Sequence, residues 1–480
     1  MKDKIKETID YLMKKKVDYA DIRHQKTNLE DIKVKNGNVE ALSRNDDQGF
    51  GIRVIADGAW GFAASSICTS EEMKRVADQA IEIAKASAIT KKENAKLAET
   101  EVHRDEYESQ YAKDPFGVSV DKKISLLLDA CKIMMKNKKI KVAEGSMQFF
   151  KTNKVFASTE KAFIEQSILE SGAGISATAV DGREAQRRSY PNSHGGDYAS
   201  RGYEFVEEMN LLENAERVQE EAIQLLSADP LPEMETTIII SGNQLALQVH
   251  ESCGHPTELD RVLGTEISLA GGSFLTLDKL NKLKYGSEKV TITADASLSG
   301  GLGSFGYDDE GVKAQRVDLV RNGLFVGYQT SRETALVLNQ KSNGTMRADG
   351  WNRIPLIRMT NINLEPGEWE LDDLIKDTQS GFFLETNKSW SIDDKRLNFQ
   401  FGVEAAWEIK DGKLGKIYKN GVYTGMTPQF WNSCDAVCNR KHWHIWGVPN
   451  CGKGEPMQIM HVAHGTSPTR FRNVKVGVSK

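Results

Sequence analysis

The stretch HESCGH, residues 250–255, places two histidines and a glutamate close together in the chain. Zinc binding needs imidazole nitrogens or thiolates that converge on one point. On a regular α-helix each residue turns by about 100°, so histidines four apart share a face and histidines five apart do not. If His250 and His255 bind one metal ion, the spacing predicts a looped-out residue, such as a π-bulge. Gly254 and Pro256, on either side of His255, favour such an interruption of the helical hydrogen bonds.

Glu251 follows His250 directly. In a zinc peptidase, a carboxylate at this position is the general base that takes a proton from the attacking water. From the residues alone, the alternative is a pair of surface histidines beside an ordinary glutamate, because the spacing is not the usual one. Glu258 and Asp260, which follow His255, are candidates for orienting a ligand histidine, with a surface role as the alternative.

A catalytic zinc site needs a third protein ligand, which must come from elsewhere in the chain. The residues alone leave three sources open. One is Cys451 on a glycine-flanked loop, and another is the pair His461 and His464. The third is a cluster for which core packing is the favoured interpretation, because its CxxxC spacing is looser than usual; it consists of Cys434, Cys438, His442 and His444.

Two further features of the second half could serve a substrate. The glycine-rich segment ASLSGGLGSFG, residues 296–306, could admit an extended peptide as an added strand, although glycines that only serve turns are an equal alternative. The acidic residues Asp308, Asp309 and Glu310 could hold the amino terminus of a substrate or support the metal site from outside. A solvated turn is the favoured interpretation of these three residues.

The elements that must position these residues fall into two parts. Periodic patterns predict helices over residues 1–16, 70–87, 122–137 and 202–227, and Asn-Gly and Asp-Gly at 36–37 and 57–58 predict hairpins. Two prolines in ADPLPEM, residues 228–234, precede the buried-strand pattern TTIIIS and indicate a boundary near residue 230. We therefore expect an α+β chain of two domains. An N-terminal helix-and-sheet domain, residues 1–229, precedes a β-rich C-terminal domain, residues 230–480, that carries the metal site.

The composition limits the classes of function. The 480 residues are 39% hydrophobic and carry a net charge of -5, which is typical of a globular protein and does not favour nucleic acid as a partner. No apolar run approaches the roughly 18 residues that cross a membrane, and the charged N-terminus lacks the apolar stretch of a signal peptide. The six cysteines are sparse, so we expect reduced thiols and a cytoplasmic protein without a nucleic-acid or membrane partner.

Four motifs together resemble the TldD/PmbA family. They are QGFGIRVIADGAWGFAASS at 48–66, HESCGHPTELD at 250–260, FGYDDEGVKAQRVDLVRNG at 305–323 and NCGKGEPMQ at 450–458. The motifs occur in the order of the family, and the resemblance spans residues 17 to 475. The PmbA branch, also called TldE, lacks the histidine pair, so this chain resembles the catalytic, TldD-type branch.

The resemblance implies a zinc-dependent peptidase with an HExxxH motif. It makes His250, His255 and Cys451 the ligands of a Zn²⁺ ion and Glu251 the general base. The positions after CGK vary in the family, and His461 and His464 there could crowd the site or play no part. Such a peptidase cleaves unfolded or leader-bearing peptides with a metal-activated water in the enclosed cavity of a dimer. The dimer forms with a PmbA/TldE-type paralog or with a second copy. The alternative is a non-catalytic peptide-binding or scaffolding subunit, against which the intact Glu251 argues.

Overall fold

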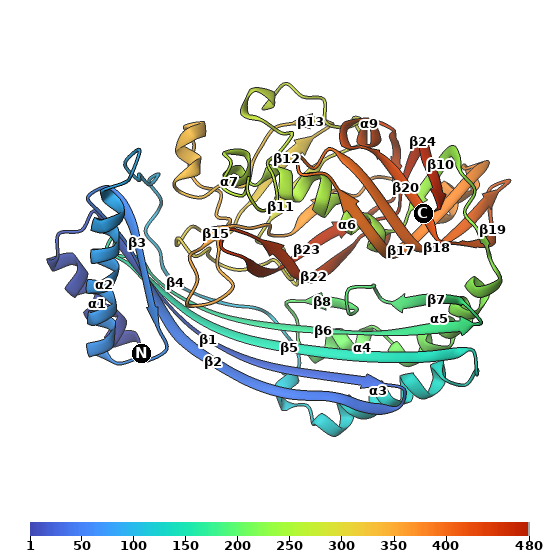
Figure 1. Ribbon diagram of the computed structural model, residues 1–480, viewed down its shortest axis with the longest axis horizontal. Coiled ribbons are helices and arrows are strands. Elements are labelled where there is room, and N and C mark those ends of the chain that lie inside the picture. Colours follow the sequence, from blue (N-terminus) through green and yellow to red (C-terminus); the bar gives the residue numbers. More distant parts are fainter. Residues whose placement is uncertain (479–480) are drawn as a thin grey trace.

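A long, strongly curved sheet organises the first part of the chain, and the structure, a computed structural model, describes residues 1–478 (Figure 1). The strand order is β3-β2-β1-β5-β6-β4, and β7 and β8 also pair with β6. The turns predicted at residues 36–37 and 57–58 join β1 to β2 and β2 to β3, which confirms both hairpins. The strands are β1 Tyr19–Lys35, β2 Asn38–Ala56, β3 Ala59–Ser65, β4 Arg104–Glu108, β5 Ile140–Ser158, β6 Phe163–Asp181, β7 Glu184–Tyr190 and β8 Asp197–Ala199.

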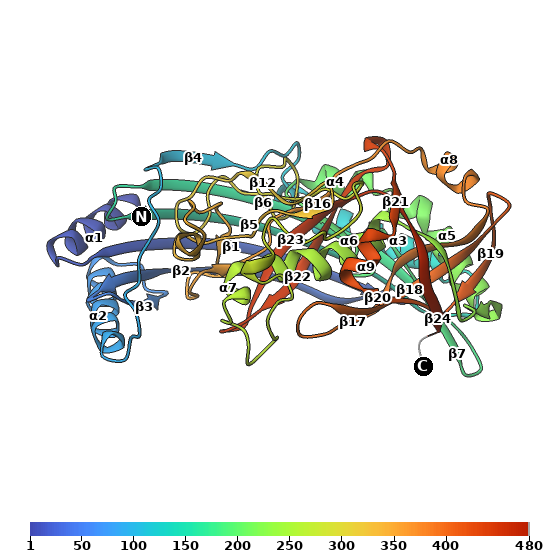
Figure 2. The same cartoon turned by 90° about the horizontal axis from the view of Figure 1, so that it is seen from above.

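Helices cover this sheet in two groups. α1 (Lys2–Lys14) and α2 (Ser70–Ala88) pack at one end of the sheet, beyond the C-terminal part of the chain (Figure 2). α3 (Val120–Met134) and α5 (Leu211–Ser227) share a second core with β5 and β6, beside α4 (Tyr203–Glu208) and the short 3₁₀ turn η1 (Pro115–Gly117). The single helix predicted over 202–227 is wrong: Asn210 adopts a left-handed φ of 50°, which asparagine tolerates, and divides α4 from α5.

A second, smaller sheet forms the core of the C-terminal part. Its strands follow the order β17-β10-β24-β20-β18, and β17 also pairs with β18, so these strands close on themselves. The predicted buried strand is confirmed as β10, whose residues 238–240 are isoleucines with no exposed surface. The strands are β10 Met234–Ile240, β17 Ser380–Ile392, β18 Asn398–Lys410, β20 Gly421–Met426 and β24 Thr469–Val478, with β9 Asp229–Pro230, β19 Lys413–Lys419 and β21 Cys434–Val437 attached.

Short strands and turns surround this closed sheet. A two-stranded ribbon of β22 (His444–Lys453) and β23 (Gln458–Thr466) lies between it and the long sheet (Figure 1). The remaining strands are β11 Ile292–Asp295, β12 Arg316–Arg321, β13 Leu324–Phe325, β14 Met346–Arg347, β15 Leu356–Ile357 and β16 Ile362–Leu364. The remaining helical segments are α6 Gly242–Val249, η2 His250–Gly254, η3 His255–Thr257, α7 Leu259–Val262, η4 Leu277–Lys279, η5 Thr334–Leu338, α8 Leu371–Lys376, α9 Thr427–Asn432 and η6 Arg440–His442. The predicted fold class, α+β with a β-rich C-terminal region, is confirmed, while the boundary at residues 229/230 stays a prediction.

Buried ion pairs join the two parts of the chain. Arg53 on β2 contacts Glu310 at 3.6 Å, and Arg23 on β1 contacts Asp309 at 3.3 Å. Asp308 accepts hydrogen bonds from the backbone amides of Val312 and Met346. The solvated turn predicted for residues 308–310 is therefore wrong, because these carboxylates are buried and already paired.

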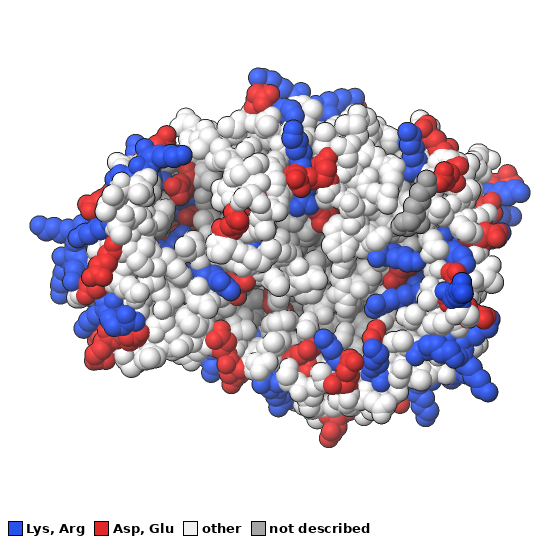
Figure 3. Space-filling model, viewed as in Figure 1, with Lys and Arg blue, Asp and Glu red and all other residues white. Residues whose placement is uncertain are grey.

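The surface shows both signs of charge. Figure 3 shows lysine, arginine, aspartate and glutamate interspersed on one face, which is hollowed between the long sheet and the C-terminal part. Within residues 1–478, every helix falls short of the length and hydrophobicity that a membrane crossing requires.

Candidate metal centre

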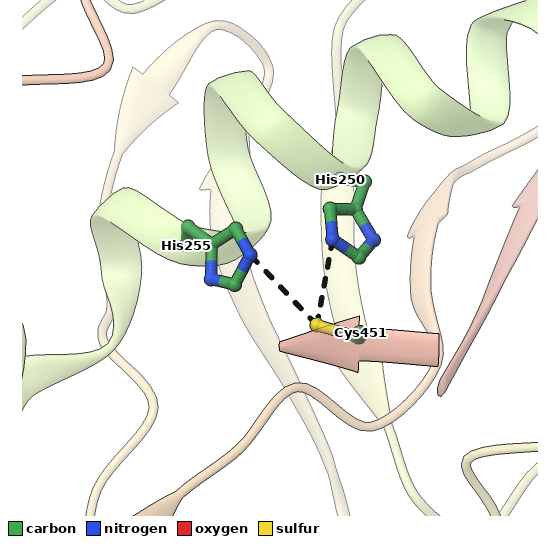
Figure 4. A group of neighbouring side chains, drawn as sticks. All are labelled: His250, His255 and Cys451. Carbon is green, nitrogen blue, oxygen red and sulfur yellow. Dashed lines mark hydrogen bonds between the residues drawn. The ribbon is translucent and has the colours of Figure 1, made fainter. Parts of the chain in front are cut away.

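The two histidines of HESCGH lie on a π-helical turn. α6 passes directly into this turn, η2, where the amide of His255 donates to the carbonyl oxygen of His250, five residues back. A turn closed over five residues aligns positions i and i+5, which a regular α-helix would separate by about 140°. The predicted looped-out residue is thereby confirmed, and both imidazoles point to the same side of the helix (Figure 4).

Side chains stabilise the distorted turn by bonding to carbonyl groups that the regular helical ladder would occupy. The Tyr285 hydroxyl donates to the carbonyl oxygen of Ser252 at 2.8 Å. Thr257 and Gln329 donate to the carbonyl oxygen of Gly254, each at 2.9 Å. Because these groups are buried, the bonds remove the cost of leaving polar atoms unpaired.

Cys451 approaches both histidines from β22 (Figure 4). Its Sγ lies 3.5 Å from His250 Nε2 and 3.8 Å from His255 Nε2, and the three ligand atoms all lie within 4.8 Å of one another. Zn–N and Zn–S bonds of about 2.0 and 2.3 Å give a tetrahedral N···S edge of about 3.6 Å. The two N···S distances thus match those of a zinc site with one position left over.

A hydrogen-bonded chain sets the tautomer of His250. His464 is neutral, because burial lowers its pKa well below the usual value, and its Nδ1–H donates to the carbonyl oxygen of Ile362 at 3.1 Å. His464 Nε2 must then accept, so His250 donates through Nδ1 at 2.7 Å. The lone pair of His250 Nε2 therefore faces Cys451, as metal ligation requires.

Glu258 does the same for His255. Its carboxylate, fully buried, accepts from His255 Nδ1 at 3.0 Å, which leaves Nε2 free to bind a metal ion. Lys453 lies 3.4 Å from Glu258 and 2.7 Å from Asp260. The ligand-orienting candidate Glu258 thus contacts a histidine, whereas Asp260 contacts a lysine instead. Cys451 and Lys453 are two apart on one strand, so the CGK sequence presents a metal ligand and the partner of Glu258 on the same face.

The charges around Cys451 favour a thiolate. Burial alone would raise the pKa of this thiol, but His250 and Arg358 outweigh it and hold the pKa well below the usual value. Conversely, burial opposes protonation of His250, and the Cys451 thiolate raises its pKa. Metal ligation needs the thiolate and a neutral imidazole, so binding of a metal ion would displace any proton that His250 shares with Cys451. The donor set of two histidines and one thiolate suits Zn²⁺.

Glu251 lies beside His250 on the same turn and is 6% exposed. Its Oε2 accepts from Arg396 Nη1 at 2.7 Å. Arg396 lies in the turn between β17 and β18, where its amide donates to Asp393 and its carbonyl oxygen accepts from Thr427. This backbone bonding orders the turn from which the Arg396 side chain reaches the carboxylate.

The structure separates His461 and residues 434–444 from this group, whereas the candidate His464 contacts His250. His461 donates through Nδ1 to the carboxylate of Glu170 on the long sheet, at 2.8 Å. Among residues 434–444, His442 bonds to Glu370 and His444 to Asp197, while both cysteines are buried in hydrophobic surroundings. Cys434 and Cys438 each pack in a hydrophobic cluster, which confirms that these cysteines belong to the core.

Gly301 and Gly303, within residues 296–306, serve close packing, whereas Gly300 has a positive φ of 79° that suits a turn. A Cβ atom at Gly303 would lie 2.4 Å from the Thr360 carbonyl oxygen, and one at Gly301 would lie 2.5 Å from the Asn361 side chain. Neither distance is compatible with a larger residue unless the backbone moves.

Two residues of the site, Arg358 and Arg396, were not predicted from the sequence, and a third, His464, was predicted in a different role. Arg358 interrupts the apolar run IPLIRM, and a cation within an apolar run is the sequence signal that could have indicated its burial. Arg396 lies in a polar turn, DDKRLN, that is typical of any exposed hairpin. His464 was a candidate metal ligand, and the structure shows it instead as the hydrogen-bond partner of the ligand His250.

Comparison with known families covers most of the chain. Three family models match: "PmbA/TldA metallopeptidase domain 1" at residues 20–84, "PmbA/TldA metallopeptidase central domain" at 113–228 and "PmbA/TldA metallopeptidase C-terminal domain" at 233–478. A protein named Metalloprotease MJ0996 from Methanocaldococcus jannaschii is 30% identical over 91% of this chain and 92% of its own.

Two further proteins are similar to this chain, one by its sequence and one by its structure. A "Zinc metalloprotease TldD homolog" from Saccharolobus solfataricus is 22% identical over 96% of both chains. The crystal structure of TldE from Thermococcus kodakarensis superimposes with a TM-score of 0.76, at 17% identity, over 99% of this chain and 100% of that one. At this identity the superposition shows a shared fold.

Proposed function

The chain belongs to the PmbA/TldA metallopeptidase family, and from this premise we propose that it is a TldD-type, zinc-dependent peptidase. The observation that carries the proposal is the convergence of His250, His255 and Cys451 on one buried point, with Glu251 beside them. A site that only held structural zinc would have no use for a carboxylate next to its first ligand.

Each residue has a distinct part in the proposed reaction. Zinc would supply Lewis acidity for the scissile carbonyl and for the attacking water. Glu251 takes a proton from that water and gives it to the leaving nitrogen. Arg396 holds Glu251 Oε2, so the other carboxylate oxygen, Oε1, is the one that receives the proton.

The depth of the site supports an extended substrate. The three ligands and Glu251 are 3–6% exposed, so a folded protein surface would not reach them. A single unfolded segment, bound as an extended strand, is the substrate that we expect such a buried site to admit. We infer that the substrates are unfolded or leader-bearing peptides, cleaved in the enclosed cavity of a dimer. The second subunit is a PmbA/TldE-type paralog or another copy of this chain, and the place of action is the cytoplasm.

Substitution of Glu251 tests the proposal. E251Q should retain about one zinc per chain, and the rate of hydrolysis of an unstructured fluorogenic peptide should fall about 10²- to 10⁴-fold. Glu404→Gln is the matched control, because Glu404 is also buried but pairs with Arg188 and Ser189 and contacts none of the ligands, so the variant should keep both zinc and cleavage. Normal cleavage by E251Q would refute the general-base role. Peptide binding without cleavage by the wild-type protein would favour the scaffolding alternative.

A further inference from the structure

Arg358 is a buried cation that touches the sulfur of Cys451. It follows β15 and has no exposed surface. Its Nη2 donates to Cys451 Sγ at 3.1 Å and to the Cys451 carbonyl oxygen at 2.6 Å, and its Nη1 donates to the Gln458 carbonyl oxygen at 3.2 Å. One guanidinium thus spans the β22–β23 ribbon and reaches the proposed metal ligand.

The thiolate is the charge partner of this arginine. A buried guanidinium is costly unless a negative group compensates it. Within residues 1–478, the acceptors that Arg358 reaches are the Cys451 sulfur and the backbone carbonyl groups of Cys451 and Gln458, with no carboxylate among them. The Cys451 sulfur is therefore the anionic group that this cation meets. Arg358 would be poorly placed if Cys451 were a neutral thiol.

This contact bears on the strength of the metal as a Lewis acid. A thiolate lowers the net charge of a zinc site to about +1, and it donates more electron density than a neutral imidazole does. A hydrogen bond from a cation withdraws part of that density, in the way that hydrogen bonds to sulfur tune other metal–thiolate centres. Together, zinc, thiolate and guanidinium carry about +2, the charge of a site with three neutral histidines.

We propose that Arg358 is a positioning residue that holds Cys451 and withdraws electron density from its sulfur, so that a His–His–Cys site acts as a strong Lewis acid. The inference rests on the proposed metal site but concerns a different residue and a different property. Arg347 offers a matched comparison. It is a neighbouring arginine that also donates to backbone carbonyl groups, of Met359 and His461, without a hydrogen bond to the sulfur.

The charge-transfer band between thiolate sulfur and Co²⁺ measures the electron density on the sulfur directly. We would load the full-length wild-type protein and the R358Q, R358K, R347Q and C451A variants with Co²⁺ and record absorption spectra. The band should be absent in C451A and shifted to longer wavelength in R358Q, because an unbonded thiolate gives up an electron more easily. R347Q should shift the band much less than R358Q does, since Arg347 makes no hydrogen bond to the sulfur.

R358K covers the case in which R358Q does not fold. Lysine carries its donors on a single nitrogen and cannot reproduce the contacts that the guanidinium makes through Nη1 and Nη2, so its band should lie between those of wild-type and R358Q. A band at the wild-type wavelength in R358Q, or in R358K if only that variant folds, would overturn the role of Arg358 while leaving the metal site intact. A wild-type protein with no Cys451-dependent band would overturn the metal site itself, and the inference with it.

Discussion

The group His250–His255–Cys451 and the segment of residues 434–444 are built from the same residue types, and they end in different surroundings. In the first, two histidines five apart and a cysteine about two hundred residues away meet within 4.8 Å. In the second, the two cysteines lie four residues apart and pack into different hydrophobic clusters. A high local density of metal-binding residue types is thus a poorer guide than the backbone geometry that aims them.

The hydrogen bonds of the histidines explain the difference. At the metal centre, Nδ1 of His250 and of His255 is occupied by a partner, which leaves each Nε2 directed at Cys451. In the segment 434–444, the Nε2 atoms of His442 and His444 are themselves occupied by Glu370 and Asp197. The same side chain acts as a ligand or as an ion-pair partner depending on which nitrogen its neighbours engage.

Removal of one cysteine from each group gives the largest contrast. C451A should abolish zinc binding and peptide cleavage, because the loss of a ligand should exceed the about 100-fold loss of affinity typical of outer partners. C438A should retain about one zinc per chain, with a modest loss of stability from the vacated core volume. Metal analysis of the dialysed proteins decides the outcome. Equal zinc in both variants would mean that Cys451 is no ligand.

The sequence predicted the geometry of the histidines better than the identity of the third ligand. Helical arithmetic on His250 and His255, with Gly254 between, was enough to predict the π turn that the structure has. The residues alone left Cys451, the pair His461 and His464, and the 434–444 cluster open. Cys451 was singled out by resemblance to a family, because local spacing says nothing about a contact across about two hundred residues.

Local sequence patterns predicted individual helices and hairpins, but they did not predict which distant strands pair with one another. Alternating residues and Asn-Gly turns predicted the hairpins of the long sheet, because those signals are contained in a few residues. The closure of the second sheet depends on β17 pairing with both β10 and β18, which no local pattern encodes. The solvated turn predicted at residues 308–310 was wrong because the ion-pair partner of Asp309, Arg23, lies almost three hundred residues away in the chain.

The residues that hold the ligand histidines in place test whether their orientation makes them metal ligands. E258Q removes the negative charge of the carboxylate that accepts a hydrogen bond from His255 Nδ1. The substitution should weaken zinc affinity about 10- to 100-fold. D260N should have a smaller effect, because Asp260 contacts Lys453 and not a histidine. Competition with a chelator measures both affinities. An equal loss in the two variants would indicate that general disruption of the charge network, and not the orientation of His255, accounts for the effect.

Gly254 tests whether the π turn needs a residue without a side chain. A Cβ atom there would lie 2.1 Å from Met359 Sδ, so G254A must displace a fully buried methionine. Overpacking of this kind should reduce the free energy of unfolding by about 1–3 kcal/mol and loosen zinc binding. The penalty should shrink in an M359A background, where the space is vacant. Denaturant unfolding of the four proteins gives the coupling, and strictly additive effects would contradict this contact.

His444 provides the smallest effect and the counterpart to the ligand histidines. Burial disfavours its charged form, but the Asp197 carboxylate, 2.6 Å away, outweighs burial and raises its pKa above 6.5. Because the folded pKa lies above the unfolded one, the ion pair stabilises the fold fully below about pH 6.5, and the stabilisation is lost as pH rises through the folded value.

The side chain is 46% exposed, so solvent limits the contribution of this pair to about 1 kcal/mol or less. H444Q should therefore lower the thermal midpoint slightly at pH 5.5, leave it unchanged at pH 9, and retain zinc at both. Asp197 keeps its bonds to the amides of Tyr198 and Gly447, which limits further damage. A loss of zinc in H444Q would erase the contrast between the two groups, since a histidine of the second group would then act at the metal centre.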